Sequence, residues 1–218
     1  VVALVGVLTA LGAAVVAFTR KDLKRILAYS TVSQLGFMML AIGTGNTFGA
    51  VFHLITHGFF KALLFLCAGS VIHGLHDSLQ GASSAGVDDA GGLSGKLPVT
   101  FSCFVVGALA LAGFPPLSGF FSKDLILEGV LETESYALNA LVSLIAAGSS
   151  LYIFRMLFLT FLGERGAQRG PRAHAHEPGL WMRVPLLLLA VLSAAAGALG
   201  PSGVLARMFG VETPHLSL

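Results

Sequence analysis

The chain has 218 residues, of which 55% are hydrophobic and only 11% are charged. With a mean hydropathy of +0.85, this composition predicts an all-α, polytopic transmembrane helix bundle and excludes an assembly of soluble domains. The formal net charge is +2, and no run of Lys and Arg is long enough for nucleic-acid binding, so we expect no nucleic-acid partner.

Apolar runs divide the chain into about six predicted membrane spans. Their residue ranges are 1–18, 26–43, 50–72, 97–131, 136–162 and 184–199. The sequence begins inside the first run without an initiator Met, a basic segment or a cleavage site, so we do not interpret that run as a signal peptide. We expect residues 1–218 to form a single transmembrane domain, the C-terminal part of a larger subunit.

Basic residues gather on one side of the predicted bundle. If the spans alternate in direction, the connections 20–25, 75–96 and 163–183 share one membrane face. That face holds nine basic residues and the opposite connections hold none; the nine are Arg20, Lys21, Lys24, Arg25, Lys96, Arg165, Arg169, Arg172 and Arg183. Cytoplasmic connections carry an excess of Lys and Arg. We therefore expect the longer connections, 76–96 and 163–183, to be cytoplasmic loops.

The fourth span, residues 97–131, is too long for one straight helix, since 35 residues would extend over ~52 Å. Its middle reads AGFPPLSGFFSKD, and prolines inside a helix remove hydrogen bonds and clash with the preceding turn. We expect a discontinuous helix, broken at Pro115-Pro116 in mid-membrane. Such breaks mark ion and substrate sites in transporters.

Lys123 and Asp124 follow directly after the predicted break. Ser118 and Ser122 are possible caps of the second half-helix, because serine is a preferred N-cap residue. The positive end of that half-helix would then lie beside Lys123 and Asp124 and favour an ionised carboxylate.

The third span carries His53, His57 and Lys61 at intervals of four residues. This spacing places the three side chains within about an 80° arc of one helix face. Lys61 falls near the middle of a ~30 Å hydrocarbon layer, where a charge costs roughly 2.5 to 3.5 kcal/mol. One interpretation is a proton relay, since imidazole titrates near neutral pH and burial favours the neutral form of lysine. The other is static: histidines bonded to neighbouring helices and Lys61 in an ion pair.

Metal binding is the weaker interpretation of the histidines. Zinc ligands use a four-residue spacing, but no Glu follows His53 and no third ligand is evident, so we expect no metal. His174 and His176 lie in a predicted loop, where a solvated connector is expected. Cys67 and Cys103 lie inside apolar runs, where they are expected to act as small hydrophobic residues.

Lys24 permits two interpretations. It lies in the basic connection 20–25 and can anchor a helix end at the membrane interface. It can also begin a polar stripe with Thr31 and Gln34 that serves as a cytoplasmic access path. The residues alone leave both possibilities open.

Four motifs together resemble the large antiporter-like subunit L of bacterial respiratory complex I, an NADH-quinone oxidoreductase, and its mitochondrial counterpart, subunit 5. They cover nearly all of the chain in the family's order: DLKRILAYSTVSQLGFMMLAIG (22–43), HLITHGFFKALLFLCAGSVIH (53–73), LALAGFPPLSGFFSKDLIL (109–127) and YIFRMLFLTFLGE (152–164). The resemblance implies two inverted helix repeats, each with a broken helix, of which this chain is the second. It implies a proton-translocating membrane subunit of NADH:quinone oxidoreductase.

The resemblance also assigns roles to individual residues. Lys61 corresponds to the central lysine of a mid-membrane hydrophilic axis, with His53 and His57 as its neighbouring relay histidines. Lys24 corresponds to a lysine near the cytoplasmic side of that axis. Lys123, together with Asp124, corresponds to the terminal charged site from which the proton leaves toward the periplasm.

A relay order follows as a hypothesis. Two like charges about 6 Å apart repel by roughly 2.8 kcal/mol at an effective dielectric constant of ~20, so protonating one group can drive a proton from its neighbour. The expected order is Lys24, then His57 and His53, then Lys61, then Lys123 with Asp124.

No nucleotide, flavin, iron–sulfur or quinone motif is visible in the chain. The resemblance implies that NADH, FMN, the iron–sulfur clusters and quinone belong to partner subunits. Expected partners are other membrane subunits of complex I, protons and the lipid bilayer of a bacterial inner membrane. The alternatives are an Mrp-type cation/proton antiporter, a membrane subunit of an energy-converting hydrogenase and, from another class, a structural membrane scaffold.

Overall fold

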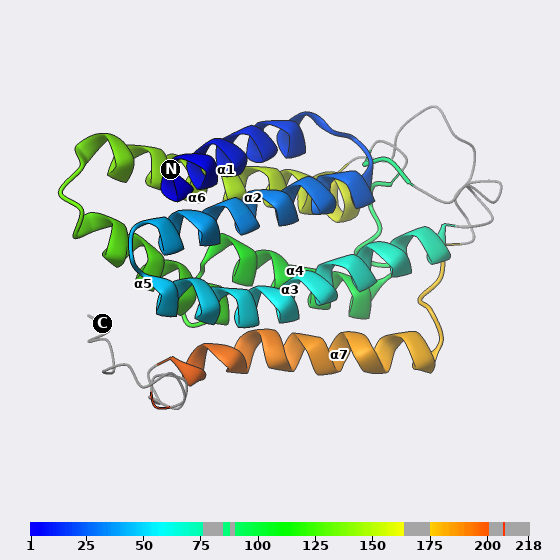
Figure 1. Ribbon diagram of the computed structural model, residues 1–218. Helices are drawn as coiled ribbons and strands as arrows, with labels where there is room; N and C mark the ends of the chain where they lie inside the picture. The colour runs from blue at the N-terminus through cyan, green and yellow to red at the C-terminus, as the bar shows by residue number, and fades with distance from the viewer. Residues whose placement is uncertain (76–84, 88–89, 164–174, 201–206, 208–218) are drawn as a thin grey trace.

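A computed structural model describes residues 1–75, 85–87, 90–163, 175–200 and 207. Over these residues the chain is helical, apart from turns, connections and one isolated β-bridge between Asp22 and Gly86. The helices (Figure 1) are α1 (Val2–Thr19), α2 (Leu23–Gly43), α3 (Thr47–Gly74), α4 (Pro98–Ala112), α5 (Ser118–Leu131), α6 (Tyr136–Leu157) and α7 (Leu180–Ala195). A π-helical turn, Phe158–Leu162, extends α6, and a 3-10 turn, Ala196–Leu199, extends α7.

The predicted all-α membrane bundle is confirmed. Five helices are long and apolar enough to cross a membrane: α1, α2, α3, and α6 and α7 with their extensions. The shorter α4 and α5 follow one another and make the sixth, interrupted span. Helix α2 begins at Leu23 instead of residue 26, because the Asp22 carboxylate caps it by accepting a 2.9 Å hydrogen bond from the Arg25 amide.

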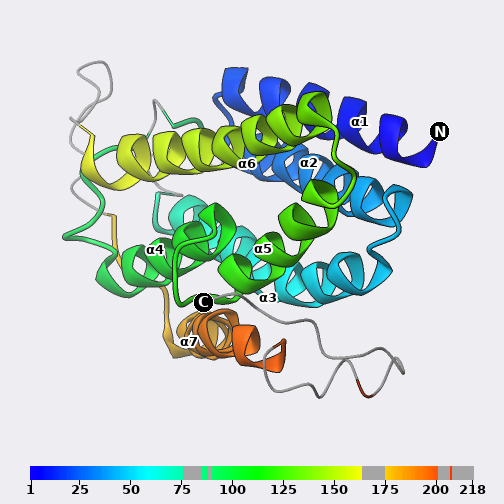
Figure 2. The same ribbon diagram turned by 90° about the vertical axis from the view of Figure 1, so that its left-hand side faces the viewer.

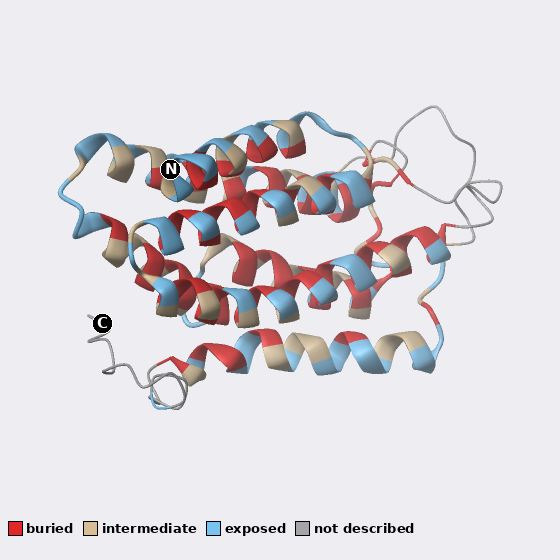
Figure 3. Cartoon of the chain, in the orientation of Figure 1, coloured by how far each residue is buried: buried red, intermediate tan, exposed pale blue. Residues whose placement is uncertain are grey.

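Helix α3 is the centre of the bundle. It packs against α2, α4, α5 and α7, and its buried face runs along most of its length (Figure 3). In the view of Figure 2, α1, α2 and α6 lie together on one side of α3 and α7 lies on the opposite side. Side chains of α3 therefore reach the interior from the middle of the molecule.

The predicted basic connections meet at one end of the bundle. The Leu23 amide donates to the Ala85 carbonyl (3.0 Å), and the Val87 amide donates to the Lys21 carbonyl (2.7 Å). The Gly91 amide donates to the Thr160 carbonyl (3.0 Å) at the end of the α6 extension. Residues 76–84, 88–89 and 164–174 of the predicted loops lie outside the described residues.

Small residues bring two pairs of helices into close contact. Gly6 and Gly36 lie against the backbones of α2 and α1, respectively, where a Cβ atom would collide. Gly119 of α5 lies against the Ala110 carbonyl of α4 in the same way. Such residues allow membrane helices to approach one another closely.

The predicted break at Pro115-Pro116 is confirmed, and local chemistry explains it. Helix α4 ends with Gly113 in the left-handed conformation (φ 84°). The Phe114 amide donates to the Leu109 carbonyl and the Gly113 amide to the Ala110 carbonyl, a Schellman ending. The two prolines that follow have no amide hydrogen to continue the helix.

Neither Ser118 nor Ser122 caps α5. The N-cap residue is Leu117, without a side-chain cap, and a backbone bond from the Phe120 amide to the Leu117 carbonyl closes the first turn. The Ser118 hydroxyl has no partner among the described residues, and the Ser122 hydroxyl is bonded to another helix. Lys123 consequently lies beyond the first turn, to which helix-dipole effects are confined.

Candidate functional site: a buried polar network

Lys61 projects from the middle of α3 and is only 4% exposed. Its ammonium donates to the Ser30 hydroxyl at 2.6 Å and to the Leu27 carbonyl at 3.3 Å, both on α2. The Ser30 hydroxyl in turn donates to the Tyr152 hydroxyl of α6 at 2.8 Å. Among the described residues no carboxylate contacts Lys61, so the structure shows no static ion pair there.

Lys123 is the second enclosed amine, also 4% exposed. It donates to the Leu111 carbonyl of α4 at 2.5 Å and to the Ser149 hydroxyl of α6 at 2.8 Å. The Leu111 carbonyl is available because the residue four positions later is Pro115, which has no amide hydrogen. The helix break thus creates an acceptor for Lys123.

Asp124 does not pair with Lys123. Its side chain is half-buried, and no hydrogen bond joins the two. Consecutive residues of a helix point about 100° apart, so Lys123 enters the bundle while Asp124 lies on a neighbouring face of α5. Lys123 and Asp124, which the resemblance groups as one terminal charged site, are therefore consecutive in sequence without a hydrogen bond between their side chains.

His53 uses both ring nitrogens. Nδ1 lies 2.8 Å from the Ser122 hydroxyl of α5, and Nε2 lies 3.0 Å from Oε1 of Gln34 on α2. The Ser122 hydroxyl also accepts from the Thr56 hydroxyl at 2.9 Å. Gln34 is, with Ser30, a polar neighbour of the Tyr152 hydroxyl. His53 therefore joins three helices at the centre of the bundle.

His57 differs from His53 in its bonding. Its ring centroid lies 5.9 Å from that of His53 and 5.3 Å from that of Phe60. Its Nε2 atom is buried and has no hydrogen-bond partner among the described residues. Lys61 lies four residues further along α3 and shares this helix face with His57.

We call these side chains the polar network. Its members are Gln34, Ser30, His53, Thr56, His57, Lys61, Ser122, Lys123, Ser149 and Tyr152, from α2, α3, α5 and α6. Hydroxyl, imidazole, amide and amine groups inside an apolar bundle can pass protons or bind water, and they leave the lysines free to change charge.

Lys24 lies outside the polar network. It is exposed on the first turn of α2, at the end where the basic connections meet. Lys61 reaches the Leu27 carbonyl, one turn further along the same helix. The Thr31 hydroxyl also bonds to Leu27, at 2.9 Å, within its own helix.

Sequence reasoning missed four hydroxyl groups of the network, of which Thr56 binds Ser122. Ser30 and Ser149 bind the two lysines, and Tyr152 binds Ser30. A usable signal was present: Ser149 and Tyr152 are three residues apart in an apolar span, so they share one face of α6. Choosing them over other hydroxyl residues required knowing which face of α6 meets α2 and α5.

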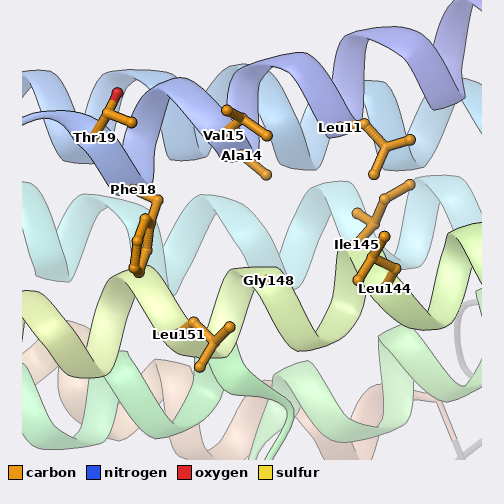
Figure 4. Close-up of a pocket in the computed structure, with 9 residues that line it drawn as sticks. All are labelled: Leu11, Ala14, Val15, Phe18, Thr19, Leu144, Ile145, Gly148 and Leu151. Atoms are coloured by element: carbon orange, nitrogen blue, oxygen red, sulfur yellow. The ribbon is translucent and has the colours of Figure 1, made fainter.

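Other candidate sites lack chemistry of this kind. No three His, Cys, Asp or Glu side chains in the described part of the chain gather as a metal site requires. Cys67 and Cys103 are buried as free thiols. A cavity of about 270 Å³ between α1 and α6 (Figure 4) is apolar and is lined by residues such as Leu11, Phe18 and Ile145, none of them from the polar network.

Comparison with known proteins identifies the family. A family model described as the transmembrane part of NADH:quinone oxidoreductase/Mrp antiporter proteins matches residues 1–149. The chain belongs to this family. It is 43% identical over 202 residues to NADH-ubiquinone oxidoreductase chain 5 of Dictyostelium citrinum, covering 91% of this chain and 29% of the relative. It is 42% identical over 199 residues to NADH-quinone oxidoreductase subunit L of Rickettsia typhi, with 91% and 29% covered.

The predicted resemblance to subunit L and chain 5 is therefore confirmed, and the chain spans about 29% of the length of these relatives. Among solved structures, an archaeal membrane-bound sulfane sulfur reductase matches with a TM-score of 0.78 and 30% identity over 90% of this chain and 31% of that chain. The Mrp complex of Dietzia sp. matches with a TM-score of 0.76 and 24% identity over 93% and 44%, which shows the fold alone.

Proposed function

We propose that this chain is part of a proton-translocating membrane subunit of an NADH:quinone oxidoreductase. Protons move along its buried Lys and His side chains while partner subunits carry the NADH, flavin, iron–sulfur and quinone chemistry. The observation that carries the proposal is the pair of enclosed lysines, each held by a hydroxyl and a carbonyl instead of a carboxylate. An amine in that setting has no counter-ion that fixes its charge.

The polar network supports a path with several steps. Lys61 donates to the Leu27 carbonyl of α2, which lies one turn further into the bundle than Lys24. This position supports Lys24 as the access point at the basic end of the bundle. His53 is bonded to Ser122, the residue before Lys123. His57 lies one helical turn from Lys61 on the same face of α3, and like charges at that spacing repel one another. Lys123 and the half-buried Asp124 form the other end of the path.

The orientation belongs to the same proposal. Basic connections gather at the end of the bundle where Arg20, Lys21 and Lys24 lie, and an excess of Lys and Arg marks the cytoplasmic side. We place that end in the cytoplasm of a bacterium and the α5–α6 connection on the outer side of its inner membrane. Partners are then the other membrane subunits of the complex.

The deciding experiment replaces Lys61 by alanine in the assembled complex, reconstituted into liposomes. We expect NADH-driven internal acidification to fall at least severalfold, while the NADH:quinone reductase rate of the same preparation shows that the complex has assembled. Lys21→Ala, an exposed lysine at the basic end, is the matched control and should pump normally. Normal acidification by Lys61→Ala would leave the chain as a structural scaffold.

Because the family includes Mrp antiporters, the coupling ion needs its own test. Pumping that persists without sodium supports proton translocation. Pumping that requires sodium in the same liposomes supports a cation/proton antiporter instead.

A further inference from the structure

Tyr152 is enclosed in the bundle with 0% of its surface exposed, and it meets Lys61 only through Ser30. Ser30 has a single hydroxyl proton, which it donates to the Tyr152 hydroxyl, and its oxygen accepts from Lys61. The direction of the Ser30 hydroxyl therefore depends on Tyr152. A serine that lacks such a partner tends to bond to the carbonyl four residues earlier in its own helix.

Lys61 has a second acceptor nearby. His57 lies one turn earlier on α3, and helical side chains lean toward the preceding turn. Its Nε2 atom is buried and without a partner among the described residues, while Lys61 acts on the ring electrostatically. The flexible Lys61 side chain can thus point to Ser30, as it does in the structure, or toward His57.

We propose that Tyr152 is a positioning residue that holds Lys61 on Ser30 and away from His57, so that proton exchange between Lys61 and the histidine waits for this contact to open. This inference rests on the proposed function. Written from Lys61 to His57, the reverse of the expected relay direction, one N–H bond of the Lys61 ammonium breaks and a bond forms between that proton and Nε2 of His57, in the tautomer that carries its own proton on Nδ1. The products are a neutral amine and an imidazolium, so charge and protons balance. In the relay direction the same two bonds change in the opposite sense.

The hydroxyl groups at the other lysine lack this arrangement. Ser149 accepts from Lys123 but donates to the Ala146 carbonyl of its own helix at 2.7 Å. No second side chain sets the direction of its hydroxyl. Only at Lys61 is the direction of the serine hydroxyl set by a side chain of a third helix. That side chain is Tyr152 of α6.

The test uses Tyr152→Phe, which keeps the ring and removes the hydroxyl, in the complete complex in liposomes. We expect passive proton leak to rise and the protons pumped per NADH to fall, each roughly twofold to tenfold, the factor that one neutral hydrogen bond contributes to an equilibrium. The NADH:quinone rate should stay normal. Tyr29→Phe, on the other side of α2 from the network and stacked on Arg20, is the matched control and should change neither quantity.

Two further variants separate positioning from a merely structural role. If Tyr152 acts through Ser30, the double variant Ser30→Ala with Tyr152→Phe will leak no more than the more affected single variant. Ser30→Thr keeps a hydroxyl at this position and should show normal leak where Ser30→Ala does not. If the leak passes through His57, it will disappear when Tyr152→Phe is combined with His57→Leu. Additive effects, or a leak that survives His57→Leu, overturn the inference.

The result also distinguishes this inference from the proposed function. If Lys61→Ala loses pumping while Tyr152→Phe shows normal leak and pumping, only the role of Tyr152 is rejected and the proposed function stands. Normal pumping in Lys61→Ala rejects both. Should Tyr152→Phe fail to assemble, the leak of Ser30→Ala against Ser30→Thr decides the inference.

Discussion

The two buried lysines obtain their hydrogen-bond acceptors inside the bundle in different ways. Lys61 lies on the unbroken α3 and depends on side chains from two other helices, with Ser30 bonded in turn to Tyr152. Lys123 lies just past a helix break and depends on a backbone carbonyl that Pro115 leaves without a helical donor. The carbonyls of a continuous helix already accept from helical amides, so Lys61 shares the Leu27 carbonyl at 3.3 Å and makes its shorter contact, 2.6 Å, with the Ser30 hydroxyl.

The surroundings of the two lysines are therefore held in place by different parts of the chain. Around Lys123 the geometry is set by the backbone, through the close approach of α4 and α5 at Gly119. Around Lys61 it is set by hydrogen bonds between side chains, which rotate and exchange partners more easily than a backbone moves. His53, bonded to α2 and α5, connects the two regions.

The largest effect is expected where the backbone itself is the support. In Gly119→Ala, the new methyl group would collide with the Ala110 carbonyl and push α5 away from α4. We expect a loss of about 3 kcal/mol in the free energy of unfolding, at the upper end of overpacking effects. Thermal unfolding of the purified protein in detergent measures it.

Gly148→Ala is the control for that substitution, because nothing lies within 4 Å of the added methyl group. It should stabilise α6 by about 0.5 to 1 kcal/mol. Equal effects at the two glycines would contradict a backbone-determined Lys123 region.

An intermediate effect is expected from the histidines. His53→Leu leaves Ser122 and Gln34 without their common partner, and we expect it to cost about 2 to 3 kcal/mol of unfolding free energy. His57→Leu breaks no bond at Nε2 and should cost less than about 1 kcal/mol. The same unfolding measurement ranks the pair, and a reversed order would show that His57 is the structural histidine.

The smallest effects compare the two serines. Ser30→Ala removes two bonds between helices, and we expect it to cost about 1 to 2 kcal/mol; Ser149→Ala removes one, and Lys123 keeps the Leu111 carbonyl, so about 0.5 to 1 kcal/mol is expected. Unfolding midpoints of the two variants, measured side by side, test the difference. If Ser149→Ala were the more damaging, the backbone carbonyl would not be the main support of Lys123.

Much of the fold could be predicted because its causes are local. Membrane thickness sets the length of an apolar span, and the spans were found within a few residues. The break at Pro115-Pro116 follows from missing amide hydrogens. The start of α5 could not be predicted in the same way, because a backbone turn at Leu117 closes the first turn of the helix without a serine cap.

The candidate site was predictable only in part. Placing a charged or imidazole side chain inside a membrane span costs free energy, so such residues are rare there. For this reason the sequence alone indicated His53, His57, Lys61 and Lys123. Hydroxyl groups carry no such cost in a helix, so the spacing of Ser149 and Tyr152 could not be told from that of other hydroxyl residues until the packing of α6 was known, and Ser30 gave no distinct signal. The relay roles of these residues, of Lys24 and of Asp124 remain predictions for the experiments above.

The sequence by itself determined the membrane class, the number of spans, the interrupted helix, the asymmetry of basic residues and the stripe on α3. All of these follow from composition, periodicity and the chemistry of proline. Tertiary structure alone decided that Lys61 binds Ser30, that Lys123 binds Leu111 and Ser149, and that one histidine is fully bonded while the other is not. These pairings depend on the rotation and depth of each helix, which close packing at residues such as Gly36 and Gly119 fixes.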